Sequence, residues 1–212
     1  MLFDKDHSVA DSLFRPLNLR SSMLVALVTL LGFAVLVLPV KAHHPLEGMS
    51  PENYNAWQGI LSGLVHPVLG IDHLVFLVSI GLARLVDVRT WVLLLISCAL
   101  IGSITGLILP PLLLQEAWMG LSLIALAVVS LKRFPPIWVL PLAMFHGYVL
   151  AGAMVGAKPT PLAGYLCGLL VSELALIIIG FLLVQRFQSQ SSLMTGIVVG
   201  FGLSITGAAI LP

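Results

Sequence analysis

The chain has 212 residues, of which 59% are hydrophobic and 9% are charged, and its formal net charge is +1. Soluble domains carry about a quarter charged residues, so this composition excludes a soluble globular protein and indicates a polytopic membrane protein. The balanced charge and the lack of basic patches with interleaved aromatic residues argue against nucleic-acid binding.

The first 42 residues are predicted to be a leader. A polar stretch over 1–21 precedes an apolar run over 23–40, and Val40-Lys41-Ala42 fits a small-residue cleavage pattern. These are the parts of a secretory signal peptide. Both the polar stretch and the apolar run are long for such a peptide, so an uncleaved first transmembrane helix is the alternative. Either way, residue 43 is expected outside the cytoplasm.

A short polar external segment over 43–55 leads into a domain over 56–212. This domain divides into six apolar stretches, near 56–85, 91–108, 117–131, 137–155, 161–185 and 193–211. Most of them approach the roughly 20 residues that a helix needs to cross a bilayer. We therefore expect an all-α membrane bundle of six transmembrane helices after the leader helix. The first stretch is long enough to contain a break.

The charges between the stretches predict an orientation. With residue 43 outside, the cytoplasmic ends carry five cations: Arg84, Arg89, Lys132, Arg133 and Arg186. The external loops carry only Lys158 and Glu116. Because cytoplasmic loops are enriched in Lys and Arg, this asymmetry supports the assignment. We expect a bacterial inner-membrane protein whose mature N-terminus and C-terminus both lie in the periplasm.

Small residues recur within several stretches. Ser103-Ile104-Thr105-Gly106 of the second stretch is echoed by Ser204-Ile205-Thr206-Gly207 of the sixth, and the fifth has Gly164 and Gly168. Small residues four apart let transmembrane helices approach closely. The pattern predicts tight helix packing, within the chain or at the interface of a homo-oligomer.

The polar chemistry of the first stretch is concentrated in residues 66–73, with sequence His-Pro-Val-Leu-Gly-Ile-Asp-His. Ionisable groups at membrane depth are costly and usually face a partner or a watery cavity. Imidazole and carboxylate ligands suit a divalent metal such as nickel, cobalt or zinc. His66, Asp72 and His73 therefore favour a metal site, and a proton relay is the alternative.

Pro67 and Gly70 separate these polar groups. Proline biases the residue before it, His66, away from helical geometry, and glycine tolerates an unusual backbone. We therefore expect a bend or an unwound turn over 66–70. Broken helices often build ion sites near the middle of a membrane, because freed carbonyls can join the side-chain ligands.

Two further ionisable groups lie in later stretches, His146 in Phe145-His146-Gly147 and Glu173 in the fifth stretch. Gly147 permits close approach of a helix or an ion. Each group has an alternative interpretation: His146 as a packing residue bonded to a neighbouring helix, and Glu173 as a protonated acid bonded to a serine or tyrosine. Both interpretations stay open beside a role in metal binding.

His43 and His44 would follow the cleaved leader directly. A free amine followed by two imidazoles is a chelating group for nickel or copper. The alternative is that the pair merely reflects where the leader ends.

The pattern His66-Pro-x-x-Gly70-x-Asp72-His73, together with Phe145-His146-Gly147, resembles the HupE/UreJ family of small bacterial nickel permeases. The resemblance extends over most of the mature chain and includes the leader and the histidine after it. It implies that nickel, or cobalt, is a transported substrate and not a tightly bound cofactor. It also implies that a hydrogenase or a urease receives the metal.

The chain departs from the family pattern at two positions. Family members often carry a second histidine a few residues after the one matching His146, where this chain has Leu150. Many also carry a histidine in the fifth stretch, where this chain has Ile177, and Glu173 one turn earlier is a candidate replacement. These changes bear on metal choice more than on transport. The variant resembles forms associated with cyanobacteria.

Together, these features predict a secondary permease for nickel or cobalt in the lipid bilayer. The predicted metal-binding residues are His43, His44, His66, Asp72, His73, His146 and Glu173. No P-loop is present, so the energy must come from an ion gradient, the membrane potential or a partner. An intramembrane metalloenzyme is one alternative, but the His-Glu-x-x-His and Gly-x-Ser-x-Gly motifs are absent, and we expect no catalytic residue. A metal sensor or accessory subunit is the other.

Overall fold

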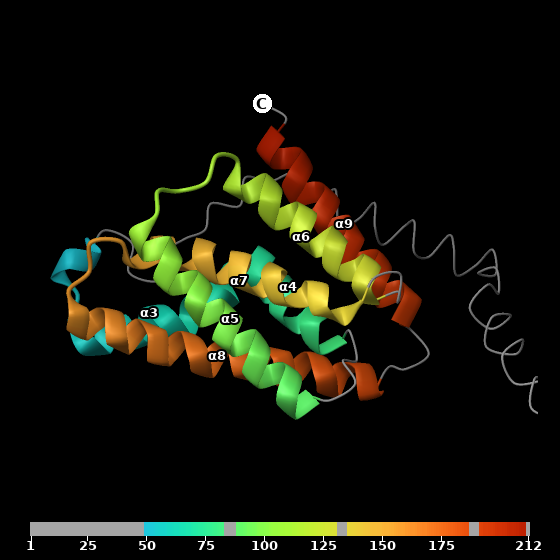
Figure 1. The fold of residues 1–212 in the computed structure, drawn as a ribbon, viewed down its shortest axis with the longest axis horizontal. Coiled ribbons are helices and arrows are strands. Elements are labelled where there is room, and N and C mark those ends of the chain that lie inside the picture. The colour runs from blue at the N-terminus through green and yellow to red at the C-terminus, as the bar shows by residue number, and fades with distance from the viewer. Residues whose placement is uncertain (1–48, 83–87, 131–134, 187–190, 211–212) are drawn as a thin grey trace, which may run out of the picture.

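The computed structural model describes residues 49–82, 88–130, 135–186 and 191–210. Across these residues the chain forms seven α-helices and three short 3-10 helices, without a strand, which confirms the predicted all-α fold (Figure 1). The α-helices are α3 (Ala56–Leu69), α4 (Ile71–Leu82), α5 (Val88–Ile108), α6 (Gln115–Ser130), α7 (Val139–Leu150), α8 (Pro159–Arg186) and α9 (Ser191–Ile210). The 3-10 helices are η1 (Pro51–Asn53), η2 (Pro136–Trp138) and η3 (Ala151–Met154). The leader over 1–42 and the histidines at 43 and 44 lie outside the described residues.

The helices fall in the six predicted apolar stretches. Among the described residues, three segments are long and apolar enough to cross a membrane: Trp91–Ile108, Pro136–Met154 and Pro159–Leu183. The pair α3 and α4 passes the same test as one span, bent by 78°. The remaining apolar helices, α6 and the Met194–Ile210 part of α9, are shorter. The count of six crossings and the orientation therefore stay predictions.

Three helix pairs form the frame of the bundle: α3 with α8, α5 with α7, and α6 with α9 (Figure 1). Glycines bring each pair together. A methyl group on Gly63 would lie 2.1 Å from the Tyr165 carbonyl oxygen, and one on Gly102 would lie 1.9 Å from that of Met144. Between α6 and α9, a methyl group on Gly120 would lie 2.5 Å from the Gly202 carbonyl oxygen. Backbones this close leave room only for glycine, as in other tightly packed transmembrane helices.

The two copies of the Ser-Ile-Thr-Gly motif have different surroundings. A methyl group on Gly106 would lie 2.2 Å from the Tyr148 carbonyl oxygen, whereas one on Gly207 would meet no atom of the described residues within 4 Å. The last glycine of the first copy therefore packs within the chain, and that of the second copy does not. A homo-oligomer remains a prediction.

The first stretch breaks within the predicted region, but the break falls at Gly70. α3 continues through Pro67 with His66 in the helix, and Gly70 then takes an extended conformation, with φ −74° and ψ 100°. The expectation that Pro67 displaces His66 from helical geometry was therefore wrong. A proline inside a helix frees the carbonyl four residues earlier, here Gly63. The Ser172 hydroxyl of α8 donates a hydrogen bond to that carbonyl at 3.2 Å, which satisfies it from a neighbouring helix.

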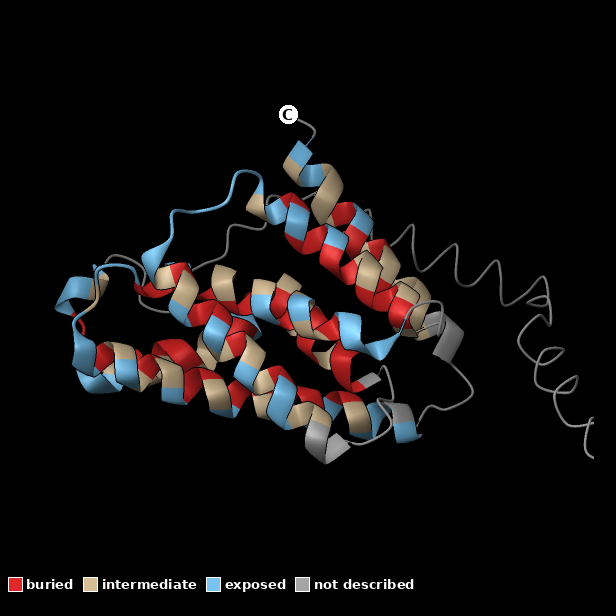
Figure 2. Cartoon of the chain, viewed as in Figure 1, coloured by how far each residue is buried: buried red, intermediate tan, exposed pale blue. Residues whose placement is uncertain are grey.

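Helix α4 lies inside the bundle. None of its described side chains over 71–81 is exposed, and it contacts α3, α6, α8 and α9. Its residues Phe76, Leu77 and Ile80 belong to the main hydrophobic core. The outer helices instead expose large apolar side chains, among them Leu93, Ile101 and Leu182, as expected for contact with lipid (Figure 2). A helix buried on every side carries the polar groups at its start into the centre of the protein.

Candidate metal site

Three predicted histidines lie next to one another around the start of α4. The ring centroids of His66 and His73 are 5.6 Å apart, and those of His73 and His146 are 5.8 Å apart. Two imidazoles bound to one ion through bonds of about 2.1 Å have centroids roughly 4.5–6.5 Å apart. On an unbroken helix, seven residues would separate His66 from His73 by roughly 10.5 Å along the axis. The break at Gly70 therefore brings the two rings to a spacing that one ion can bridge.

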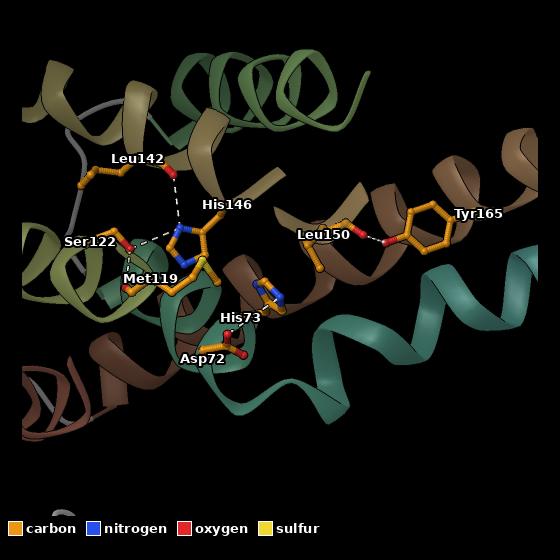
Figure 3. Close-up of polar contacts among 8 residues, drawn as sticks. All are labelled: Asp72, His73, Met119, Ser122, Leu142, His146, Leu150 and Tyr165. Atoms are coloured by element: carbon orange, nitrogen blue, oxygen red, sulfur yellow. Dashed lines mark hydrogen bonds and ion pairs between the residues drawn. The ribbon is translucent and has the colours of Figure 1, made fainter. Parts of the chain in front are cut away.

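His146 is held in one orientation and one tautomer. Its Nδ1 atom lies 3.2 Å from the Leu142 carbonyl oxygen and 3.4 Å from the Ser122 hydroxyl (Figure 3). A carbonyl can only accept, so Nδ1 carries the proton. The Ser122 hydroxyl donates to the Met119 carbonyl at 2.6 Å, which leaves its oxygen free to accept from Nδ1. The Nε2 atom is buried without a hydrogen-bond partner in the described parts of the chain and keeps its lone pair, as in metal-binding histidines whose other nitrogen donates to a carbonyl.

The plane of the His146 ring is fixed by stacking. Phe76 of α4 lies parallel to it, with ring centroids 3.4 Å apart and an interplanar angle of 7°. Phe145 meets it edge-on at 5.9 Å. Neither Phe76 nor Ser122 was predicted to belong to the site. Phe76 follows His73 by three residues, a spacing that places both on one helix face, so the sequence held a signal for it.

Asp72 and His73 form the polar start of α4. Their side chains approach to 4.0 Å between Asp72 Oδ2 and His73 Nε2, and the Asp72 side chain is 25% exposed (Figure 3). A carboxylate in the first turn of a helix is stabilised by the helix dipole. His73 is buried, and its Nδ1 atom has no hydrogen-bond partner in the residues that the structure describes. A methyl group on Gly70 would lie 2.7 Å from the His73 ring and 3.1 Å from Asp72 Oδ1, so the glycine leaves room for both.

Glu173 lies in the middle of α8 and is 1% exposed. Among the described residues, its Oε2 atom has no hydrogen-bond partner. The nearby hydroxyls donate elsewhere: Tyr165 donates to the Leu150 carbonyl at 2.6 Å, and Ser172 donates to backbone carbonyls. Glu173 lines a narrow pocket together with His146. The structure thus places it beside the histidine of α7.

One comparison with known proteins identifies the family of the chain. The family model described as HupE / UreJ protein matches residues 27–210. The chain belongs to the HupE/UreJ family. It is accordingly a multi-pass membrane protein related to nickel and cobalt transport, from a family of transporters and accessory proteins and not of enzymes. Neither the curated proteins nor the solved structures gave a match.

The polar groups of this HupE/UreJ protein do not form a closed coordination shell. Within the described parts of the chain, no three His, Cys, Asp or Glu side chains are grouped so that they could hold a metal ion. His66, His73 and His146 instead form a row of neighbouring rings. Side-chain rotation must bring them together around an ion, and the metal site stays a prediction. The likeness to cyanobacterial members of the family stays one as well.

Proposed function

We propose that this HupE/UreJ protein is a secondary permease that admits Ni²⁺, or Co²⁺, and binds it at His66, Asp72, His73 and His146. One observation carries the proposal. Within the part of the chain that the structure describes, His73 Nδ1 and His146 Nε2 are both buried without hydrogen-bond partners, on rings 5.8 Å apart. Each buried polar atom without a partner costs about 1–3 kcal/mol. A divalent cation between the two rings would remove that cost, because it accepts both lone pairs.

The open arrangement of these groups suits transport. Conduction requires binding that is favourable enough for the ion to enter and weak enough for it to leave. Asp72 is the most exposed of the charged and imidazole groups at the start of α4, so it can meet a hydrated ion first and offset part of its charge. His73 and His146 then replace water ligands with nitrogen. His43 and His44, which lie outside the described residues, would capture the ion beforehand.

The membrane potential can supply the energy. Moving one charge through 100 mV is worth about 2.3 kcal/mol, so a dication gains about 4.6 kcal/mol on moving inward. This driving force needs no nucleotide. In this proposal the ion passes from the periplasm to the cytoplasm, where a hydrogenase or a urease uses it.

Reconstitution of the full chain into liposomes that enclose a Ni²⁺-sensitive dye tests the proposal. A potential that is negative inside should drive influx, and His73→Ala should reduce it about tenfold. Ser79→Ala, which removes another buried polar group of α4 without touching the histidines, is the matched control and should transport as wild type does. Equal influx through wild type and His73→Ala, at equal amounts of folded protein, would refute the site. Tight metal binding without influx would favour the accessory-protein alternative.

A further inference from the structure

A narrow pocket lies between α4, α5, α7 and α8, beside the row of histidines. Its volume is about 10 Å³, room for about one water molecule or one bare ion. Eight of the ten residues around it are apolar, and the other two are His146 and Glu173. The apolar lining includes Phe76, Ile80, Ala143 and Ile177.

Both polar residues of the pocket have an atom that nothing in the described structure satisfies. His146 Nε2 and Glu173 Oε2 are buried without hydrogen-bond partners, and the two residues are 2% and 1% exposed. The proton of His146 is committed to Nδ1 by the Leu142 carbonyl, so Nε2 can only accept. An ionised carboxylate oxygen is likewise only an acceptor. When Glu173 is ionised, the two acceptors that share the pocket need a cation or a hydrogen-bond donor between them.

We propose that this pocket is a second station for the transported divalent cation, with His146 Nε2 and Glu173 Oε2 as its protein ligands. The proposal rests on the permease function above and extends it. His146 belongs to both places: its ring lies 5.8 Å from His73, and it also lines the pocket with Glu173. An ion held between His73 and His146 can therefore exchange its bond to His73 for one to Glu173 while it keeps His146.

The surroundings of the pocket suit brief binding of the cation. One imidazole and one carboxylate are ligand types that Ni²⁺, Co²⁺ and Zn²⁺ accept, but two protein ligands hold an ion less firmly than a full shell. The apolar lining offers no other side-chain ligand. Phe76 is stacked on the His146 ring at 3.4 Å and limits how far that ring can turn during the exchange.

Binding measurements on the detergent-solubilised full chain separate the two stations. Co²⁺ is the probe, because its absorption in the visible range reports nitrogen and oxygen ligands. His43 and His44, which are proposed to capture the ion, are changed to alanine in all proteins of this experiment. In that background, equilibrium dialysis of His73→Ala should still find one weakly bound Co²⁺ per chain, and adding Glu173→Gln should remove it. Glu116→Gln makes the same chemical change at an exposed carboxyl group of α6 and should leave the Co²⁺ in place.

Influx into liposomes provides the second readout. Glu173→Gln alone should reduce Ni²⁺ influx about tenfold and leave Co²⁺ binding at His73 within twofold of wild type. Glu173→Asp, which keeps the carboxylate, should recover part of the influx. Residual Co²⁺ that is unchanged by Glu173→Gln in the His73→Ala protein would overturn the proposal and leave a pocket for water only. If wild type shows no influx, the permease function fails, and the dialysis still decides whether the pocket binds a cation.

Discussion

Helices α3 and α4 are two halves of one bent span, but they are packed in opposite ways. α3 exposes Trp57, Val68 and Leu69 at the surface of the bundle, whereas no described side chain of α4 over 71–81 is exposed. Both halves meet α8 backbone to backbone, but α4 also brings Asp72 and His73 into the interior. The comparison indicates that the first half builds the frame. The second half carries the costly polar groups to a place where several helices can supply partners.

Backbone hydrogen bonds continue across the break between the two halves. The Gly70 amide donates to the His66 carbonyl at 2.9 Å, and the Leu74 amide donates to the Gly70 carbonyl at 2.8 Å. These bonds bridge the point at which the chain turns by 78°. Because unpaired backbone groups are expensive within a membrane, the bend is tolerated only where such bonds and the neighbouring helices satisfy them.

The largest expected effect is a loss of stability caused by a substitution in α3. Gly63→Ala places a methyl group 2.1 Å from the Tyr165 carbonyl oxygen, so α3 must move away from α8. Overpacking of this kind should lower the free energy of unfolding by about 2 kcal/mol and the melting temperature by roughly 5 °C. Size-exclusion chromatography of heated samples in detergent measures the change.

Gly207→Ala is the control for this prediction. The added methyl group meets nothing within 4 Å, and alanine is the better helix former. Its melting temperature should equal or slightly exceed that of wild type. Equal losses in Gly63→Ala and Gly207→Ala would show that the glycine contact between α3 and α8 does not support the frame.

Gly70→Ala tests the role of the start of α4, which carries Asp72 and His73. The backbone angles of Gly70 are open to alanine, but the methyl group would lie 2.7 Å from the His73 ring and 3.1 Å from Asp72 Oδ1. The two nearest atoms belong to side chains that can turn aside. The third, the His66 carbonyl oxygen at 3.3 Å, must give by only a few tenths of an ångström, so the fold should survive while the proposed ligands are displaced. We expect a melting temperature within about 2 °C of wild type and Ni²⁺ influx about tenfold lower, equivalent to about 1.4 kcal/mol. Retained influx would place the functional ligands elsewhere.

Most of the helical layout could be predicted from the sequence, because apolar stretches separated by short polar segments leave few alternatives. The position of the break could not. Pro67 and Gly70 both qualify as helix breakers, and the hydrogen bond that lets α3 continue through Pro67 comes from Ser172, 109 residues after its acceptor, Gly63. Only the folded arrangement shows that α8 supplies this hydroxyl group.

The candidate site, like the fold, could be predicted from the sequence only in part. His66, Asp72 and His73 are close in the chain, so their shared location was predictable, and the glycine after His146 signalled a close approach. The orientation of His146 was not predictable, because Ser122 belongs to α6 and a lone serine in an apolar stretch carries no signal of its partner. The shared pocket of Glu173 and His146 likewise depends on how α7 and α8 meet.

The smallest expected effect concerns the bond that keeps α3 helical. Ser172→Ala leaves the Gly63 carbonyl without its 3.2 Å partner and should cost about 0.6 kcal/mol, the average for hydrogen bonds between membrane helices. In a Pro67→Ala background the restored amide of residue 67 can donate to Gly63 instead, so the same substitution should cost almost nothing. Unfolding in mixed micelles with increasing SDS measures both costs. Equal costs in the two backgrounds would assign the effect to the other bond of the Ser172 hydroxyl, made to the Leu169 carbonyl at 3.0 Å within α8.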